Sequence, residues 1–587
     1  MKDLQPNQKW VIISLPGDYT ELGRRYGVSP VLARILRNRG VNGDEEALSY
    51  LSTDPGILES EKYSGFNLMD MDRAVKVAAE KISEGKKIRI VGDYDIDGVT
   101  ATFILKKGLK KAGAIVDHRI PHRIRDGYGL NRNIIEEARD AGIDTIITCD
   151  NGIAAFEEVS LAKEYGMTVI ITDHHEVPFE TVSGERSELL PPADAIVDPK
   201  REGSAYPCKQ ICGAYVAYKF IVSLYGRIGM AAEEYREFLE IAAFATIGDV
   251  MPLVEENRFL VREGLKRLEN TENPGLKALI ALNQLQGKTI TPYHVGFILG
   301  PCLNAAGRLG DADDAMELLL SENEEEAHGK AVILKEMNDS RKSLTERGVT
   351  EALRLAETPE YQRDRVLVIF LADCHESIAG IIAGKVRERT GKPVFILTTG
   401  ETFDEAPCLK GSGRSVEGYN MFEEMSAVSD IFIRFGGHAM AAGLSLPRNK
   451  LGEFRERLNS NTTLRDEDLL IKLKIDMELP LSLVNMELIE ELKKLEPFGT
   501  GNEKPVFAAR DVELKDLSIL GKGGNVLKGR INDGSAYFDC IYFGSDAPDK
   551  KSYIESSGKN RFKIIYSPEI NEFRGKRSIQ IVLNGLR

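Results

Sequence analysis

The amino-acid sequence predicts an α/β protein built from several domains. Its 587 residues exceed what one hydrophobic core organises, and the usual domain size indicates about three or four units. Hydrophobic residues make up 42% of the chain and charged residues 29%, which is typical of a folded globular protein. Between residues 61 and 255, runs rich in Val and Ile alternate with runs at helical spacing, and this alternation indicates a parallel sheet covered by helices on both faces.

The first 60 residues are expected to form short helices. One of them is well marked, because Ser29 is a good N-cap, Pro30 suits the first helical turn and Gly40 suits the end. Residues 61–255 are expected to form the first α/β domain. Its predicted strands lie in residues 86–93, 114–121, 144–150 and 167–173, and its predicted helices lie in residues 98–113, 131–142 and 154–166.

Three further regions follow along the chain. Residues 256–350 are expected to form a helical connector, since they carry solvated charges at helical spacing. Residues 351–455 return to the strand–helix–strand pattern and predict a second α/β domain. Residues 456–587 begin with connecting helices. They end in runs in which apolar and polar residues alternate at strand period, and Gly and Asn separate these runs. This pattern predicts a small C-terminal β-barrel or sandwich.

Charge and cysteine content narrow the class of protein. The net charge of −14 argues against binding of duplex DNA over a broad basic face, although residues 511–587 carry a net charge of +3. Seven scattered cysteines fit a reducing compartment, so we expect a cytoplasmic protein. No apolar run approaches the ~20 residues that cross a bilayer, and we expect neither a signal peptide nor a membrane partner.

Acidic side chains and two adjacent histidines follow three of the predicted strands. They are Asp93, Asp95, Asp97, Asp150, Asp173, His174 and His175. One strand-end aspartate is commonly a helix N-cap, and an isolated Asp-His-His triplet is commonly a polar turn. Ligands of open α/β sheets bind beyond the carboxyl ends of the strands, so all these side chains are expected at one edge. Packed carboxylates repel one another unless protons or cations neutralise them, and a metal site is therefore predicted.

The donor set indicates which metal to expect. Carboxylates combined with imidazole and without thiolate favour Mn²⁺, with Mg²⁺ or Co²⁺ as substitutes. Two such ions about 3.5–4 Å apart would hold a phosphoryl group and activate water for in-line attack. We therefore expect two cations and hydrolysis of a phosphate ester.

Several motifs together resemble a known family. "VGDYDIDGVTAT" at residues 91–102, "CDNG" at 149–152, "DHH" at 173–175 and "ATIGDVMPL" at 245–253 resemble the four ordered motifs of the DHH phosphoesterase superfamily. Later motifs, from "LNAAGRLGDA" to "LEPFGTGNEKPVF", resemble the RecJ family of bacterial single-stranded-DNA-specific exonucleases. The resemblance covers nearly the whole chain. It implies two α/β domains (DHH and DHHA1) joined by a helical connector, and a C-terminal OB-like β-barrel.

The resemblance also implies a set of metal ligands. Asp93 would bind one Mn²⁺, and Asp150 would bridge both ions. Asp95, His174 and Asp249 would complete the second site. These five residues, with His175, are the expected catalytic group.

The remaining implied roles concern the substrate. His175 would contact the scissile phosphate, with Asp97 and Asp173 as supporting acids. Position 91 departs from the pattern, because several superfamily members have a histidine ligand where this chain has Val91, and this predicts a weaker first site. Besides His175, the expected substrate-binding residues are Arg123, Arg308, His375, Ser412, Arg414 and His438.

The function implied by the resemblance is specific. It is a 5′-to-3′ exonuclease that threads single-stranded DNA through a groove too narrow for duplex and releases 5′-mononucleotides, in DNA recombination and in mismatch or excision repair. Single-stranded-DNA-binding protein and a RecQ-type helicase are the expected partners. The alternatives are another phosphodiesterase of the superfamily, such as a nanoRNase or a cyclic-dinucleotide hydrolase, whose chains lack the C-terminal barrel, and a non-catalytic DNA-binding scaffold, which would have lost the acidic ligands.

Overall fold

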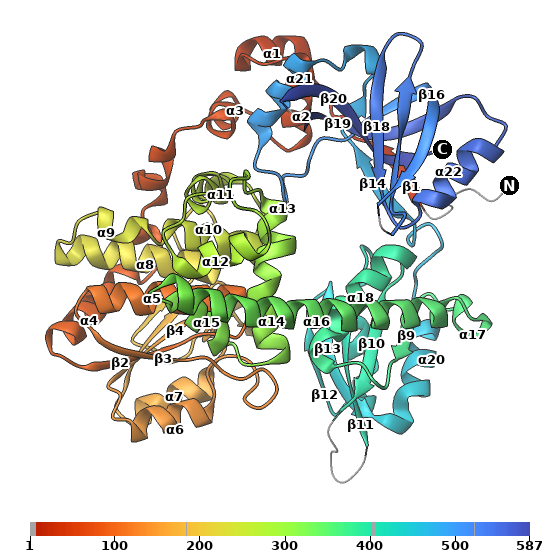
Figure 1. The fold of residues 1–587 in the computed structure, drawn as a ribbon. Coiled ribbons are helices and arrows are strands. Elements are labelled where there is room, and N and C mark those ends of the chain that lie inside the picture. The colour runs from red at the N-terminus through yellow and green to blue at the C-terminus, as the bar shows by residue number, and fades with distance from the viewer. Residues whose placement is uncertain (1–7, 183–184, 401–406, 522, 574) are drawn as a thin grey trace. The chain divides into compact units, whose positions relative to one another are not determined.

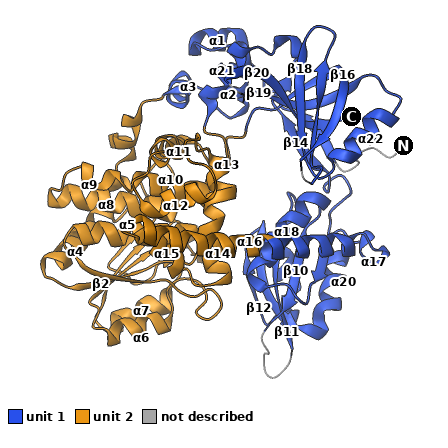
Figure 2. Ribbon diagram, in the orientation of Figure 1, with its two compact units in different colours: residues 1–52, 343–496, 504–587 blue, residues 53–342, 497–503 orange. Residues whose placement is uncertain are grey.

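The computed structural model describes residues 8–182, 185–400, 407–521, 523–573 and 575–587. The chain divides into two compact units, coloured separately in Figure 2. Unit 1 comprises residues 1–52, 343–496 and 504–587, and unit 2 comprises residues 53–342 and 497–503. Each unit has its own sheets and its own hydrophobic core.

Unit 2 is built on a five-stranded parallel sheet with the order β3-β2-β4-β5-β8. Its strands are β2 (Lys87–Val91), β3 (Ile115–Arg119), β4 (Thr145–Cys149), β5 (Thr168–Thr172) and β8 (Ala195–Val197). The chain runs from β2 to β3 on one side and then returns to place β4 on the other side of β2. The sheet therefore has a topological switch point between β2 and β4, where proteins of this architecture bind ligands at the carboxyl ends of the strands.

Helices cover both faces of this sheet (Figure 1). One face packs against α4 (Met71–Ser83), α5 (Ile96–Lys111) and α8 (Gly213–Ile228). The other face packs against α6 (Arg132–Asp140) and α7 (Phe156–Glu164). Side chains of each strand alternate between the two cores, because successive strand residues point to opposite faces: Ile90 enters the first core and Val91 the second.

The rest of unit 2 is mostly helical. A hairpin of β6 (Phe179–Val182) and β7 (Glu185–Glu188) precedes β8. The helices are α9 (Glu233–Arg236), α10 (Leu239–Gly248), α11 (Glu255–Leu268), α12 (Pro274–Leu282), α13 (Pro292–His294), the π-helical turn η4 (Val295–Leu299), α14 (Gly300–Leu309), α15 (Asp313–Leu320) and the 33-residue α16 (Glu324–Ala356), of which residues 343–356 belong to unit 1.

Unit 1 contains the second α/β fold. Its sheet has the order β12-β13-β11-β10-β9, with β9 (Leu367–Phe370) parallel to β10 (Val394–Thr399) and the other neighbours antiparallel. The other strands are β11 (Cys408–Arg414), β12 (Arg434–Gly437) and β13 (Ala441–Pro447). One face packs against α18 (Glu376–Thr390) and α16, and the other against α19 (Met421–Ser426) and α20 (Leu451–Asn461), while α17 (Pro359–Gln362) precedes β9.

The C-terminal part of unit 1 is a closed β-barrel. The strands β16 (Phe507–Leu520), β17 (Val526–Asn532), β18 (Tyr537–Phe543), β20 (Lys576–Leu586) and β19 (Phe562–Phe573) follow one another, and β16 also pairs with β19. This pairing closes the ring, which leaves no free edge among these strands. Helix α22 (Ala547–Ser556) connects β18 to β19, and β15 (Met477–Glu478) pairs in parallel with the first residues of β16.

The N-terminal segment also lies in unit 1. Helices α1 (Tyr19–Tyr26), α2 (Pro30–Asn38) and α3 (Asp44–Leu51) follow β1 (Gln8–Ile12), which pairs in parallel with β14 (Ile471–Ile475). Helix α21 (Met486–Leu492) leads towards the barrel. Within the described ranges, none of the helices combines the length and the apolar character that a bilayer span needs.

The predicted fold class is confirmed. Each predicted strand and helix of the first sheet is present, and Ser29 caps α2 as expected by accepting a hydrogen bond from the amide of Leu32. Several strand pairings were not predicted. Among them are the β5–β8 pair, the β6–β7 hairpin, the β1–β14 pair and the short β15 on β16, of which the last two use segments expected to be helical.

Candidate metal centre and phosphate-binding residues

The acidic residues meet at the carboxyl edge of the unit 2 sheet. Asp93 lies just beyond β2, Asp150 directly follows β4, and Asp173 and His174 directly follow β5. These three strands are neighbours in the order β2-β4-β5, so the residues flank the switch point. Asp249 joins them from the end of α10.

Three overlapping groups of side chains have donor atoms within 4.8 Å of one another, which is close enough to hold a cation. The groups are Asp93, Asp95 and Asp150; Asp97, His174 and Asp249; and Asp150, His174 and His175. Asp150 and His174 each belong to two groups, so the donors form one continuous cluster. We call these seven residues the strand-end cluster.

The cluster differs from the predicted grouping at one point. Asp97, rather than Asp95, lies with His174 and Asp249. Asp95 is the N-cap of α5 and accepts hydrogen bonds from the amides of Asp97 and Gly98. Asp97 lies in the first turn of the helix, and its carboxyl group faces the amides of Gly213 and Ala214 at the start of α8 instead.

The N-terminus of α8 orients the Asp97 carboxylate. The carboxylate of Asp97 accepts hydrogen bonds from the amides of Gly213 (2.6 Å) and Ala214 (2.8 Å). The free amides and the dipole at a helix N-terminus stabilise a negative charge there. The Asp97 carboxyl group is therefore held in a fixed orientation, with its Oδ2 3.4 Å from Nε2 of His174.

The backbone around Asp150 is unusual for a non-glycine residue. Asp150 has φ of 61°, in the left-handed region that aspartate tolerates better than most residues. Its carbonyl accepts a hydrogen bond from the Tyr128 hydroxyl (2.8 Å). Gly213 lies so close that a Cβ at that position would be 2.7 Å from the Cβ of Asp150. This strained conformation directs the carboxylate towards His174, whose Nε2 is 3.0 Å from Oδ1.

Glycine in the "DYDIDG" motif has a similar steric reason. A Cβ at Gly98 would lie within 2.4–2.6 Å of the backbone of Asp93. Only glycine therefore lets the first turn of α5 pack against the end of β2. This close approach brings Asp93 and Asp95 into one group.

The cluster has the electrostatics of a site that binds cations. Burial and the neighbouring carboxylates raise the pKa of Asp93 and of Asp150 well above the usual range. Burial, followed by Asp97 and Asp95, raises the pKa of Asp249 to about 9. Nδ1 of His174 and Oδ2 of Asp249 are buried with no hydrogen-bond partner. Divalent cations would remove the repulsion and fill unused coordination sites, so the donor set fits Mn²⁺ or Mg²⁺.

His175 belongs to the cluster but has a different environment from its other members. Its Nδ1 is 2.7 Å from Oδ1 of buried Asp173, and the Tyr128 hydroxyl contacts the ring at 3.2 Å. Burial alone would lower the pKa of His175, but the hydrogen bond to Asp173 and its charge raise it to about 9. The amide of Ile153 also donates to Asp173. His175 is thus a cation held at a fixed orientation next to Asp150.

Three arginines of unit 2 gather near the cluster. The Arg123 guanidinium lies 4.2 Å from the centre of the Tyr94 ring, between Asp93 and Asp95 in sequence. Burial, followed by Arg123 and Arg341, lowers the pKa of Arg308 to about 10. The charge of Asp95 acts on Arg308 in the opposite direction, so these guanidinium groups lie close to the acidic side chains, and arginine is well suited to binding phosphate. Arg341 was not predicted, because it lies in a charged helical run with no distinguishing signal.

Comparison with known proteins matches this architecture along the chain. The family model for the DHH family, N-terminal domain, matches residues 87–248, that for the DHHA1 domain residues 363–463, and that for the RecJ OB domain residues 475–585. The single-stranded-DNA-specific exonuclease RecJ of Bacillus subtilis (strain 168) is 35% identical over 558 residues, which cover 95% of this chain and 68% of the relative. The chain belongs to the RecJ family.

Solved RecJ structures agree in fold. The crystal structure of RecJ in complex with Mn²⁺ from Thermus thermophilus is 27% identical, with a TM-score of 0.81, and the match covers 100% of this chain and 80% of that chain. The structure of RecJ in complex with Mg²⁺ from the same organism is 25% identical, with a TM-score of 0.75 and coverage of 99% and 79%. Both ions expected from the donor set thus occur in RecJ crystals.

Position 91 of this RecJ-family chain has a structural explanation. Val91 is fully buried in the core formed with α6 and α7. Its side chain therefore packs beneath the sheet instead of joining the strand-end cluster. After β2 the chain supplies three aspartates, namely Asp93, Asp95 and Asp97. Asp93 is the one closest in sequence to position 91, where several superfamily members have a histidine.

Two of the predicted phosphate contacts lie together in unit 1. Ser412 and Arg414, both on β11, face Gly380 of α18, where a Cβ would be 3.2 Å from the serine Oγ and 2.7 Å from Nη2 of the arginine. Glycine at this position therefore lets both polar groups approach the helix. Burial, followed by Arg387, lowers the pKa of Arg414. Arg387 is a second cation that the sequence did not single out.

The two remaining predicted residues of this RecJ-family chain have local contacts. His375 is the N-cap of α18, and its Nδ1 is 2.7 Å from the Ser377 hydroxyl. His438 is exposed in the turn between β12 and β13, and its amide donates to the carbonyl of Ala441. The described contacts do not join either histidine to Ser412 or Arg414.

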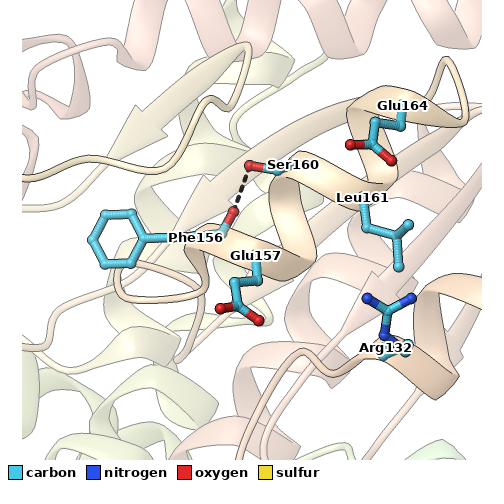
Figure 3. Close-up of a pocket in the computed structure, with 6 residues that line it drawn as sticks. All are labelled: Arg132, Phe156, Glu157, Ser160, Leu161 and Glu164. Atoms are coloured by element: carbon cyan, nitrogen blue, oxygen red, sulfur yellow. Dashed lines mark hydrogen bonds between the residues drawn. The ribbon is translucent and has the colours of Figure 1, made fainter.

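A separate pocket lies between α6 and α7 (Figure 3). It has a volume of about 370 Å³ and is lined by Arg132, Phe156, Glu157, Ser160, Leu161 and Glu164. The Ser160 hydroxyl donates a hydrogen bond to the carbonyl of Phe156 within the helix. None of the predicted functional residues lines this pocket, and its two glutamates do not suit a phosphate.

Proposed function

We propose that this RecJ-family chain is a metal-dependent exonuclease that degrades single-stranded DNA from its 5′ end and releases 5′-mononucleotides. The observation that carries this proposal is the strand-end cluster, which supplies donors for two cations in a chain that resembles RecJ exonucleases over nearly its full length. The OB-like barrel, with exposed Tyr537 and Phe543, supports a long single-stranded substrate.

The residues of the cluster divide between two cations. Asp93, Asp95 and Asp150 would hold one ion. Asp97, His174 and Asp249 would hold the other, with Asp150 close enough to His174 to bridge. Mn²⁺ is the expected cofactor, with Mg²⁺ or Co²⁺ as substitutes. When bound, the ions supply positive charge to the reacting phosphate and lower the pKa of the attacking water.

The chain's own side chains orient the phosphate. His175, anchored by Asp173 and Tyr128, is positioned to donate a hydrogen bond to a phosphate oxygen next to Asp150. This charge-assisted hydrogen bond would hold the phosphate in place. The left-handed backbone of Asp150 holds its carboxylate, the proposed metal ligand, in a fixed direction. Both groups are set before substrate arrives, so little reorganisation accompanies the reaction.

Arginine side chains are proposed to hold the phosphates of the strand. Arg123 and Arg308 lie beside the strand-end cluster, and Arg341 adds a third guanidinium, oriented by two hydrogen bonds to Oδ1 of Asn338. Ser412 and Arg414 are the proposed contacts of unit 1 for the 5′ end. His375 and His438 keep their predicted role in phosphate binding.

The cellular setting is also proposed. The seven cysteines are all free thiols, which supports a reducing cytoplasm. DNA recombination and mismatch or excision repair are the proposed pathways, with single-stranded-DNA-binding protein and a RecQ-type helicase as partners.

Labelled oligonucleotides test the activity and its direction. With Mn²⁺, a 5′-labelled single strand should lose its label as a mononucleotide at once, whereas a 3′-labelled strand should shorten progressively. Asp150→Ala should abolish cleavage and leave binding of the strand largely intact. Asp140→Ala, which alters an exposed carboxylate on α6, is the matched control and should cleave normally. Equal release of both labels would contradict the proposed direction.

The phosphate contacts of unit 1 can be tested separately. Arg414→Ala should raise KM for 5′-phosphorylated strands more than for 5′-hydroxyl strands, because the guanidinium suits a terminal phosphate. Arg389→Ala, a change in the last turn of α18, is the control. The same increase in KM for both kinds of end would argue against recognition of the 5′ phosphate.

A further inference from the structure

Two large aromatic side chains of unit 2 are exposed side by side. Tyr293 is 62% exposed and Phe297 is 68% exposed. Their rings stack, with centroids 5.1 Å apart and an angle of 26° between the planes. Adjacent aromatic rings that remain in water commonly mark a binding surface, because burying them would be favourable. We call this pair the aromatic platform.

The segment that carries the platform is firmly held. Pro292 occupies the first turn of α13, and Thr291 and His294 form a capping box. The π-helical turn η4 follows, and its Val295 and Leu299 are buried on the inner side. π-turns inside helices often occur at functional sites. The two rings are thus presented outwards from a rigid base.

The same helix leads directly to the strand-end cluster. In α14, the side-chain carbonyl of Asn304 accepts a hydrogen bond from the amide of Ile96, which lies between Asp95 and Asp97. A Cβ at Gly307 would be 2.0 Å from the carbonyl oxygen of Tyr94. Arg308 follows. Phe297 and Arg308 are eleven residues apart on this continuous helical segment, which is roughly 16 Å along its axis.

We propose that the aromatic platform stacks on an unpaired base of the DNA strand whose phosphates lie at Arg308 and the strand-end cluster. The proposal rests on the proposed nuclease function and extends it by a base-binding site. An exonuclease must accept all four bases, and stacking does so because every base has a π-face. The helix connecting the rings to Arg308 favours DNA over a protein ligand. The stacked base lies a few nucleotides from the reacting phosphate.

Substrates of different length test the platform. In Tyr293→Ala/Phe297→Ala, KM for a long 5′-phosphorylated strand should rise on the order of tenfold, the usual loss when a stacking aromatic is removed. Hydrolysis of a 5′-phosphorylated dinucleotide, too short to reach the platform, should not change. Phe66→Ala is the matched control, because Phe66 is 49% exposed on unit 2 outside this segment. An unchanged KM for the long strand overturns the proposal.

Strands with a single abasic site locate the stacked base. Wild-type protein should show a raised KM when the abasic site stands at one particular position, and the double variant should show no further rise there. Phe297→Leu should behave like Phe297→Ala, since leucine is apolar but has no π-face. The proposal is overturned if the abasic site and the double variant raise KM additively at every position. It is also overturned if Phe297→Leu keeps the wild-type KM for the long strand. Failure of the wild-type protein to cleave the long strand with Mn²⁺ would instead contradict the nuclease function itself.

Discussion

At the scale of single residues, Asp150 combines several features that distinguish the candidate metal centre. It is buried, it has a left-handed backbone, and it belongs to two of the three donor groups. Its carboxylate lies among other carboxylates that raise its pKa. Each of these features costs stability in the absence of a cation. The site is therefore arranged for binding a metal and not for the stability of the metal-free fold.

Asp150→Asn should make the metal-free protein more stable and reduce the stabilisation that Mn²⁺ provides. Asparagine has nearly the same shape and also tolerates positive φ, but it removes one negative charge. The metal-free variant should therefore melt at a higher temperature than the metal-free wild type. Wild-type protein should gain about 2.7 kcal/mol at a Mn²⁺ concentration of a hundred times Kd, and the variant should lose most of this gain.

Thermal denaturation with and without Mn²⁺ measures both effects. Asp140→Asn, at an exposed site, is the control and should respond to Mn²⁺ like the wild type. A variant that keeps the full gain from Mn²⁺ would remove Asp150 from the ligand set.

Much of the cluster could be predicted from the residues alone, and the exceptions have physical reasons. The strand-end positions of Asp93, Asp150 and His174 follow from the parallel sheet. The D-x-D-x-D spacing does not reveal that Asp95 becomes a helix cap while Asp97 turns towards α8. Which carboxylate faces which neighbour depends on where the helix begins, and that is decided by tertiary packing.

At the scale of elements, the Pro497–Glu503 loop is placed unexpectedly. The chain on both sides of it belongs to unit 1, yet the loop packs with unit 2. The amide of Leu253 donates a hydrogen bond to the carbonyl of Thr500 (2.7 Å). Gly501, with φ of 71°, lies against Pro252, where a Cβ would be 3.1 Å away. The loop therefore supports the segment that follows Asp249.

Gly501→Ala should weaken Mn²⁺ binding. The new methyl group would strain the left-handed backbone and press on Pro252, which would displace the segment that holds Asp249. Disturbing a group that supports a metal ligand commonly lowers the metal affinity by on the order of tenfold. Calorimetric titration with Mn²⁺ measures such a change.

A second glycine separates this effect from backbone strain. Gly558 has φ of 67° and no neighbour within 4 Å of its Cβ position. Gly558→Ala should lower stability by a similar backbone cost and leave Mn²⁺ affinity unchanged. Equal Mn²⁺ affinities in the two variants would show that the loop does not support Asp249.

Elements were predictable where the signal is local. The central strands are recognisable because they are fully buried runs of Val and Ile. The β1–β14 pair joins Gln8 to Ile471, and no local pattern reveals a partner so distant. The β6–β7 hairpin is polar and carries no clear alternation.

At the scale of the whole molecule, the only tryptophan reports on unit 1. Trp10 lies on β1, and the guanidinium of Arg587 stacks on its ring at 4.8 Å. A Cβ at Gly585 of β20 would be 3.3 Å from the indole. Fluorescence of Trp10 therefore follows the contact between the N-terminal strand and the C-terminal barrel.

Mn²⁺ should stabilise the two units unequally. The metal donors all belong to unit 2, so the ion should raise the temperature at which the helices of unit 2 melt, measured by far-UV circular dichroism. The melting transition reported by Trp10 fluorescence should stay in place. Asp150→Asn should show only a small Mn²⁺-dependent shift of the circular dichroism transition and none of the fluorescence transition. Equal shifts of both signals in the wild type would show that the units unfold as one.

The division of the chain has a consequence for its synthesis. Ribosomes make the amino end first, and every member of the strand-end cluster precedes residue 250. Unit 2 lacks only the Pro497–Glu503 loop once residue 342 has emerged, and it is able to fold while the chain is still growing. Strand β1 is made before unit 2 but stays unpaired until residues 471–475 appear. This strand therefore finds its place in the fold long after it has been made.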